Sequence, residues 1–165
     1  RAGDRDTMSK LKKTNAARIL DRLKIPYEIK TYAVDEDDLS AVHVDETAGI
    51  AIETVFKTLV TRGDKTGVIM AVINGGDEIN LKHLAKASGN KSVEMIHLNE
   101  LLPLTGYVRG GCSPLGAKKD YPVYIDSKAL AHEKISVSAG MRGMQLILAP
   151  QDLVRATNGT VAELV

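Results

Sequence analysis

Cysteine and aromatic residues are scarce in this 165-residue chain. The one cysteine, Cys112, excludes an internal disulfide and a thiolate metal cluster, and it predicts a reducing, intracellular setting. Tryptophan is absent, and the aromatic side chains are one phenylalanine and five tyrosines. Single-stranded nucleic acids usually stack on aromatic faces, so such stacking could be only local here.

Long hydrophobic runs and an excess of one charge are also missing. The longest apolar run, residues 68–73, is far shorter than the ~20 residues that span a bilayer. No signal peptide is visible, so we expect a cytoplasmic protein without a membrane partner. Lysine and arginine number 22 against 21 acidic residues, a net charge of +1. This balance argues against a dedicated basic nucleic-acid module but is compatible with a locally basic cleft.

The rest of the composition is that of an ordinary globular domain. Apolar residues make up 44% and charged residues 26% of the chain, which excludes disorder as the main state. The length suits a single domain with one real core. We expect residues 1–7 to be a leader or a cloning remnant, and the domain to cover residues 8–165.

Short helical and strand patterns alternate along the chain. We expect strands at residues 27–34, 54–62, 67–74, 92–97, 123–126, 134–138 and 144–149. We expect helices at residues 10–23, 40–48, 81–88, 98–104 and 151–157. Asn80 and Asn99 are the expected N-caps of the third and fourth helices, Gly89 is expected to end the third, and Pro103 is expected to interrupt the fourth. This order predicts an α/β (α+β) domain with a mixed sheet.

Most familiar catalytic motifs fail their spacing test. No G-x-G-x-x-G follows a strand, and residues 88–92 do not fit the spacing of a phosphate loop. His132 and Glu133 are followed by Ser136 at the position where a zinc motif needs its second histidine. The four histidines are far apart in the sequence, so we expect no metal site.

Three features stay open on the residues alone. Cys112 lies in the most glycine-rich loop without an accompanying base, which favours a partly buried side chain over a catalytic thiol. For Lys57, an edge-strand lysine that reaches water is favoured over a functional ammonium in a cleft. Residues 110–116 could present N–H groups to an oxyanion or a phosphate, or they could form an ordinary turn.

Ser113 and Ser138 lie outside any G-x-S-x-G elbow, so no serine-hydrolase triad is expected.

Four short segments follow one another in an order that a known family shares. They are Phe56-Lys57-Thr58-Leu59, Gly106-Tyr107 followed by residues 110–116, residues 137–143, and residues 149–153. In this order they resemble the YbaK-type aminoacyl-tRNA deacylases, relatives of the editing domain inserted in bacterial prolyl-tRNA synthetase. The resemblance covers about residues 10–160 and is to the freestanding, trans-acting branch. One departure is Ala139, where a second glycine often stands.

The resemblance implies a fold and a set of site residues. The fold is a single domain with a mixed, partly barrel-like sheet and flanking short helices. The catalytic residues that it implies are Lys57, Gly110 and Ser138. The substrate-binding residues that it implies are Tyr32, Phe56, Thr58, Gly111, Ser113 and Pro114. It implies no metal and no cofactor.

The resemblance also implies a reaction. Family members remove a wrong amino acid, typically cysteine, from tRNA(Pro), and the substrate's own thiol attacks the ester. Proximity of that thiol and N–H groups in the glycine-rich loop could then replace a protein nucleophile. The implied partners are the CCA end of an aminoacyl-tRNA and a prolyl-tRNA synthetase that could supply tRNA selectivity. Two alternatives stay open: a deacylase that uses water against another residue such as alanine, and a non-catalytic module that binds tRNA ends or a synthetase.

Overall fold

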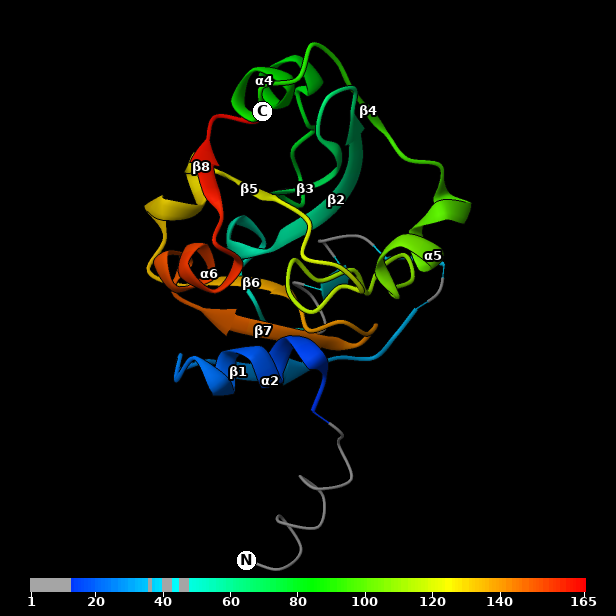
Figure 1. Ribbon diagram of the computed structural model, residues 1–165. Helices are drawn as coiled ribbons and strands as arrows, with labels where there is room; N and C mark the ends of the chain where they lie inside the picture. The colour runs from blue at the N-terminus through cyan, green and yellow to red at the C-terminus, as the bar shows by residue number, and fades with distance from the viewer. Residues whose placement is uncertain (1–12, 36, 40–42, 45–47) are drawn as a thin grey trace, which may run out of the picture.

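The computed structural model describes residues 13–35, 37–39, 43–44 and 48–165 (Figure 1). In chain order its helices, strands and short 3-10 helices (η) are α2 (Asn15–Arg22), β1 (Glu28–Thr31), η1 (Ile52–Thr54), β2 (Phe56–Gly63), β3 (Gly67–Asn74), α4 (Leu81–Ser88), β4 (Val93–Met95), η2 (Leu98–Glu100), α5 (Leu101–Thr105), β5 (Val123–Asp126), η3 (Ser127–Ala131), β6 (Ile135–Ser138), β7 (Met144–Leu148), α6 (Pro150–Thr157) and β8 (Thr160–Ala162). None of the helices in these ranges has the length and apolar character needed to cross a membrane.

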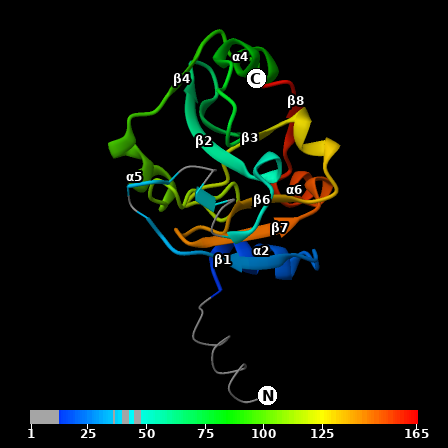
Figure 2. The same ribbon diagram turned by 180° about the vertical axis from the view of Figure 1, so that it is seen from behind.

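The strands form two sheets. The smaller sheet has three antiparallel strands in the order β1-β7-β6. The larger sheet has the order β4-β2-β3-β5-β8, in which β2 runs antiparallel to β3 and β4, whereas β5 runs parallel to β3 and β8. Figures 1 and 2 show β1 and β7 toward one end of the molecule, and α4 with the C-terminus at the other.

A single bridge connects the two sheets. Val55, just before β2, pairs in parallel with Ser136 of β6, outside the regular ladders. The described strands therefore curve around a shared interior without closing into a barrel. This arrangement confirms the expected mixed, partly barrel-like sheet with short flanking helices.

The core is continuous through the larger sheet because β3 is buried on both faces. Met70 and Val72 belong to the main cluster, which draws residues from both sheets and from α2 and α6. Ile69, Ala71 and Ile73 point to the opposite face and pack in a second cluster with α4. Strands buried on both faces lack polar alternation, which explains the unbroken apolar run at residues 68–73.

The ends of α4 agree with the sequence prediction. The Asn80 side chain accepts hydrogen bonds from the backbone N–H groups of Lys82 and His83, at 3.1 Å each. Gly89 follows the helix in the left-handed conformation. Both features satisfy backbone groups that a helix end leaves without partners.

Several predicted boundaries are wrong by a few residues. The helix predicted at 10–23 begins at Asn15, because the Thr14 side chain accepts from Ala17 N–H and caps it; residues 10–12 lie outside the described ranges. The strand predicted at 27–34 ends at Thr31, where pairing with β7 stops. The helix predicted at 40–48 falls largely on residues that the structure does not describe.

The predicted cap of the fourth helix is also wrong. His97, not Asn99, is the N-cap of η2, and the Glu100 side chain accepts from the His97 backbone N–H at 2.9 Å. Pro103 does not interrupt α5, because it lies in the first turn, where a missing N–H costs no helical hydrogen bond. The sequence analysis missed η3 and β8, which are too short to show a period.

We predict that burial on β7 controls stability. Leu146 of β7 pairs with Ile29 of β1, but Leu146 is fully buried whereas Ile29 is 37% exposed. The substitution Leu146→Ala should lower the free energy of unfolding by about 3 kcal/mol, because it leaves a cavity. The matched change Ile29→Ala should cost ~1 kcal/mol or less, because less apolar area is lost. Urea unfolding measures both, and equal losses would contradict this assignment of the core.

Candidate active site

The described part of the chain encloses a pocket of about 640 Å³ beside the start of β2. The pocket lies within the ~300–1,000 Å³ range of small-ligand sites. Its walls come from segments far apart in sequence: Tyr32, the 37–39 segment, Val44, Val55, residues 56–60 of β2, Gly75, Met95, Ile96, Leu98, Leu101, Arg109, Gly110, Cys112, Ser138 and Gln145.

Six of the nine predicted site residues line this pocket: Tyr32, Phe56, Lys57, Thr58, Gly110 and Ser138. The other three lie behind the wall. Gly111 is buried against the backbone of the neighbouring loop, and a Cβ there would lie 3.1 Å from Met141 Cα. Ser113 is fully buried, and its Oγ accepts from the Leu115 N–H at 3.3 Å; Pro114 is buried beside it. Gly111, Ser113 and Pro114 are thus buried within the glycine-rich loop and do not line the pocket. Their contact with substrate stays a prediction.

The bridge between the sheets brings the two predicted catalytic side chains to one place. Val55 pairs with Ser136, and Lys57 and Ser138 follow two residues later on their respective strands. Side chains two residues apart on a strand point to the same face, so Lys57 lies on the face of Val55 and Ser138 on the face of Ser136. Lys57 and Ser138 both line the pocket.

Lys57 is held inside the pocket wall. Its side chain is half-buried, and its Nζ donates a hydrogen bond to the Gly75 carbonyl at 3.2 Å. Lys57 and Gly75 both line the pocket. This geometry favours a functional ammonium in a cleft over an edge-strand lysine that reaches water.

The hydroxyl groups of Thr58 and Ser138 differ in their hydrogen bonding. Thr58 Oγ1 is buried and has no hydrogen-bond partner among the described residues. A buried hydroxyl without a partner costs about 1–3 kcal/mol of stability, and contact of Thr58 with a substrate stays a prediction. Ser138 Oγ is already engaged, because it accepts from the Gly140 N–H at 3.1 Å. Ser138 thus shapes the turn after β6, and no base activates it in the geometry that the structure describes.

Two loops pack against each other to form one wall. Arg142 Nε donates to the Arg109 carbonyl at 2.7 Å, which ties the turn after β6 to the glycine-rich loop. The Gly110 backbone is left-handed, with φ of +83°, a conformation that L side chains adopt only with strain. Gly110 lines the pocket, and no acceptor for its N–H is found within the described ranges. An N–H in this position can stabilise an oxyanion.

Cys112 contributes a protonated thiol to the pocket wall. Burial raises the pKa of the Cys112 thiol to about 12. Burial also raises the pKa of the neighbouring Tyr107 hydroxyl to about 12, and proximity to Cys112 adds to this shift. At neutral pH the thiol is therefore a poor nucleophile, which agrees with its interpretation as a partly buried side chain.

The sequence analysis missed Arg109 and Gln145, although both line the pocket. Arg109 is exposed and directly precedes Gly110, so its place in the glycine-rich loop was an available signal. Gln145 is directly opposite Ser138 on the paired strands β6 and β7, and its Oε1 accepts from Ser136 Oγ at 2.6 Å. Only the register of the two strands reveals that neighbour.

Within the described ranges no group of three His, Cys, Asp or Glu side chains could hold a metal ion.

Comparison with known proteins places this site in a family. Residues 36–156 match the aminoacyl-tRNA editing domain. This match spans most of the chain, and the chain therefore belongs to the aminoacyl-tRNA editing domain family, as the motifs in the sequence predict.

Its relatives include freestanding proteins and synthetases. EbsC of Enterococcus faecalis, which carries the name Cys-tRNA(Pro)/Cys-tRNA(Cys) deacylase, is 53% identical over 152 residues, covering 92% of this chain and 93% of EbsC. YwhH of Bacillus subtilis is 31% identical and covers 73% of this chain and 78% of its own length. The proline–tRNA ligase of Shouchella clausii is 29% identical over 63% of this chain but only 19% of the ligase.

Solved structures share the fold. A structure described as a trans-editing enzyme for prolyl tRNA synthetase has a TM-score of 0.75 at 21% identity, covering 91% of this chain and 96% of that chain. The protein APE2540 has a TM-score of 0.82 at 22% identity, covering 91% and 98%. At these sequence identities the structural similarity supports the fold alone. The reaction has to be inferred from the residues of the site.

We predict that Cys112 is slow to react in the folded protein. At pH 8 a pKa of about 12 leaves far less thiolate than the ordinary value of 9.0, so labelling by an aromatic disulfide should be slowed by about 10²-fold or more relative to urea-unfolded protein. The labelling rate should also rise with pH well above 9. Because the chain has one cysteine, the released chromophore reports this thiol alone. Equal rates in folded and unfolded protein would show an exposed, ionised thiol.

Proposed function

We propose that this chain is a trans-editing deacylase that removes cysteine from mischarged tRNA(Pro), and also acts on Cys-tRNA(Cys). The observation that carries the proposal is one pocket, in a member of the editing family, that is lined by Lys57 and Gly110 and, among the described residues, holds no activated protein nucleophile. The 53% identity to EbsC over nearly the full length of both chains supports the same substrate class.

The reaction needs little from the protein because an aminoacyl ester is already activated. The cysteinyl sulfur, as thiolate, bonds to its own carbonyl carbon; the bond to the ribose oxygen breaks, and that oxygen takes up a proton. Water then opens the resulting thiolactone to free cysteine. Proximity of the thiol replaces a bimolecular attack. Gly110 N–H stabilises the developing oxyanion, a contribution of about 10²–10³-fold for a well-placed donor.

Lys57 and Thr58 bind the substrate in this scheme. The Lys57 ammonium anchors the terminal adenosine and polarises the ester, while Thr58 contributes to the wall that the aminoacyl-adenosine contacts. Tyr32 and Phe56 contribute apolar walls. A binding pocket discriminates poorly between amino acids that differ by one small group, because such a group changes the binding free energy by only about 1–3 kcal/mol. Dependence on the substrate's own thiol supplies the selectivity instead.

The proposal extends to setting and partners. The enzyme works in the cytoplasm and needs neither a metal ion nor a cofactor. Its net charge of +1 gives weak electrostatic attraction to tRNA as a whole, so a prolyl-tRNA synthetase delivers the correct tRNA.

A panel of substrates tests the proposal. Single-turnover deacylation is measured on Cys-, Ala- and Ser-tRNA(Pro), with Pro-tRNA(Pro) as the cognate control. We expect fast release from Cys-tRNA(Pro) alone. Release from Ala-tRNA(Pro) at an equal rate would instead indicate a water-dependent deacylase, and tight binding without turnover would indicate a non-catalytic module.

Removing the ammonium should stop most of the reaction. Lys57→Ala should reduce kcat/KM for Cys-tRNA(Pro) by about 10²-fold or more. Lys57→Arg should restore little, because a forked guanidinium does not replace a compact ammonium in a close pocket. Folding should survive, since Lys57 is paired with a neutral carbonyl and leaves no charge behind. Thermal unfolding measured alongside deacylation checks this, and wild-type rates in Lys57→Ala would end the role of Lys57.

Arg109 should contact a phosphate of the acceptor end. Arg109 is exposed and lines the same pocket as Lys57. Arg109→Gln should raise KM for tRNA and make the slope of log KM against log salt shallower by about 0.7, the value for one contact to a single strand. The control Arg155→Gln removes an exposed cation from α6, away from the pocket, and should change neither. Identical slopes for wild type and Arg109→Gln would exclude this contact.

A further inference from the structure

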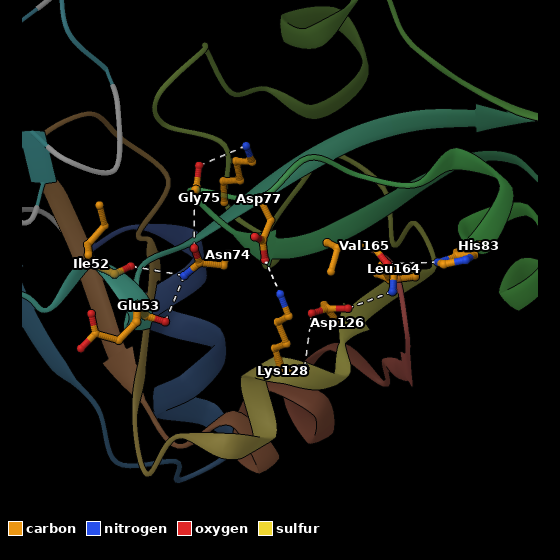
Figure 3. Close-up of polar contacts among 12 residues, drawn as sticks. Ile52, Glu53, Asn74, Gly75, Asp77, His83, Asp126, Lys128, Leu164 and Val165 are labelled. Carbon is orange, nitrogen blue, oxygen red and sulfur yellow. Dashed lines mark hydrogen bonds and ion pairs between the residues drawn. The ribbon is translucent and has the colours of Figure 1, made fainter.

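Asn74, the last residue of β3, fastens the segment before β2 to the turn that follows β3 (Figure 3). Its Nδ2 lies within hydrogen-bond distance of three backbone carbonyls, those of Ile52, Glu53 and Val55, at 3.0–3.2 Å. Its Oδ1 accepts from the Gly76 N–H at 3.0 Å. One side chain therefore adds several hydrogen bonds between two backbone segments at the end of the β2–β3 ladder.

The segments that Asn74 joins are the ones that place Lys57. Gly75 N–H donates to the Val55 carbonyl at 2.9 Å, directly beside the Asn74 contacts. The Gly75 carbonyl accepts the Lys57 ammonium at 3.2 Å and lines the pocket. A shift of the turn would move this carbonyl and, with it, the ammonium that it orients.

The acidic group nearest in sequence to this carbonyl is occupied elsewhere. Asp77 pairs with Lys128 at 3.1 Å, and the same residue closes the turn through its backbone N–H to the Asn74 carbonyl at 3.0 Å (Figure 3). Among the described residues, the hydrogen-bond partner of the Lys57 ammonium is thus a neutral carbonyl. Such an acceptor orients the ammonium but leaves its charge available to a substrate, whereas a carboxylate partner would compete with the substrate for it.

We propose that Asn74 is a positioning residue for the deacylation reaction: by clamping residues 52–55 to the 74–77 turn, it aims the Lys57 ammonium into the pocket through the Gly75 carbonyl. The inference rests on the proposed function, because it assigns to Asn74 an effect on catalysis through Lys57. A displacement of about 1 Å at a reacting group can cost up to ~10²-fold in rate, so a remote amide can matter.

Asn90 provides a matched control at the opposite end of the same hairpin. Its Oδ1 accepts from the backbone N–H groups of Lys65 and Thr66 at 2.9 and 3.0 Å, so it is also an asparagine that clamps a turn. It does not line the pocket. Asn74→Ala and Asn90→Ala should both lower the melting temperature, but only Asn74→Ala should lower kcat/KM for Cys-tRNA(Pro), by about 10-fold.

A double-mutant cycle with Lys57→Ala separates positioning from general loosening. If Asn74 acts through Lys57, Asn74→Ala should cost less than about 2-fold in the Lys57→Ala background, against about 10-fold in the wild type. The same 10-fold loss in both backgrounds would overturn the proposal, as would an equal loss of activity in Asn90→Ala. If Asn74→Ala does not fold, Asn74→Ser, which keeps one donor, enters the same cycle with the same criteria.

The outcome for the wild type keeps this inference apart from the proposed function. A wild-type protein that cleaves Cys-tRNA(Pro), together with an Asn74→Ala variant at the wild-type rate, would refute the role of Asn74 alone. A wild-type protein that cleaves none of the aminoacyl-tRNAs would refute the proposed function itself.

Discussion

The parallel bridge between Val55 and Ser136 is the contact on which the site depends. It joins the two sheets at one point, and Lys57 and Ser138 follow two residues beyond it. The same residues also serve their neighbours: the Val55 carbonyl accepts from Gly75, and Ser136 Oγ donates to Gln145. Polar groups that would otherwise be buried without partners are thereby satisfied at the junction of the sheets. A pocket formed at this junction draws its walls from both sheets and is rigid on that side.

In the proposed function the pocket binds and orients a reactive ester, and among the described residues no group is poised to attack it. Its thiol is protonated, its Ser138 hydroxyl is engaged with the backbone, and its ammonium is held by a neutral carbonyl. Such a site has free donors in place before the substrate arrives, which is what stabilises charge that develops during a reaction. Under the proposed function, a substrate that carries its own nucleophile completes the site, whereas one without a nucleophile is expected to bind without reacting.

Much of the fold and part of the site could be predicted from the sequence. Segments rich in β-forming residues located β2 and β3, and Asn80 and Gly89 marked the ends of α4, because these features depend on local chemistry. The motif around Lys57 came from the family resemblance, whereas the spacing of the residues alone favoured an edge lysine. Gln145 and Asn74 were missed because their roles arise from cross-strand register and from a turn contacting a segment some twenty residues away. No local pattern encodes such contacts.

The most direct test of the account blocks the substrate's thiol and leaves the rest of the ester intact. Single-turnover cleavage of Cys-tRNA(Pro) is compared with that of the same tRNA carrying S-methylcysteine, and competition between the two establishes that the methylated ester binds. The account predicts that the methylated ester inhibits the enzyme but is cleaved no faster than in buffer. Cleavage of both esters at similar rates would show that water or a protein group attacks, and would contradict the central claim.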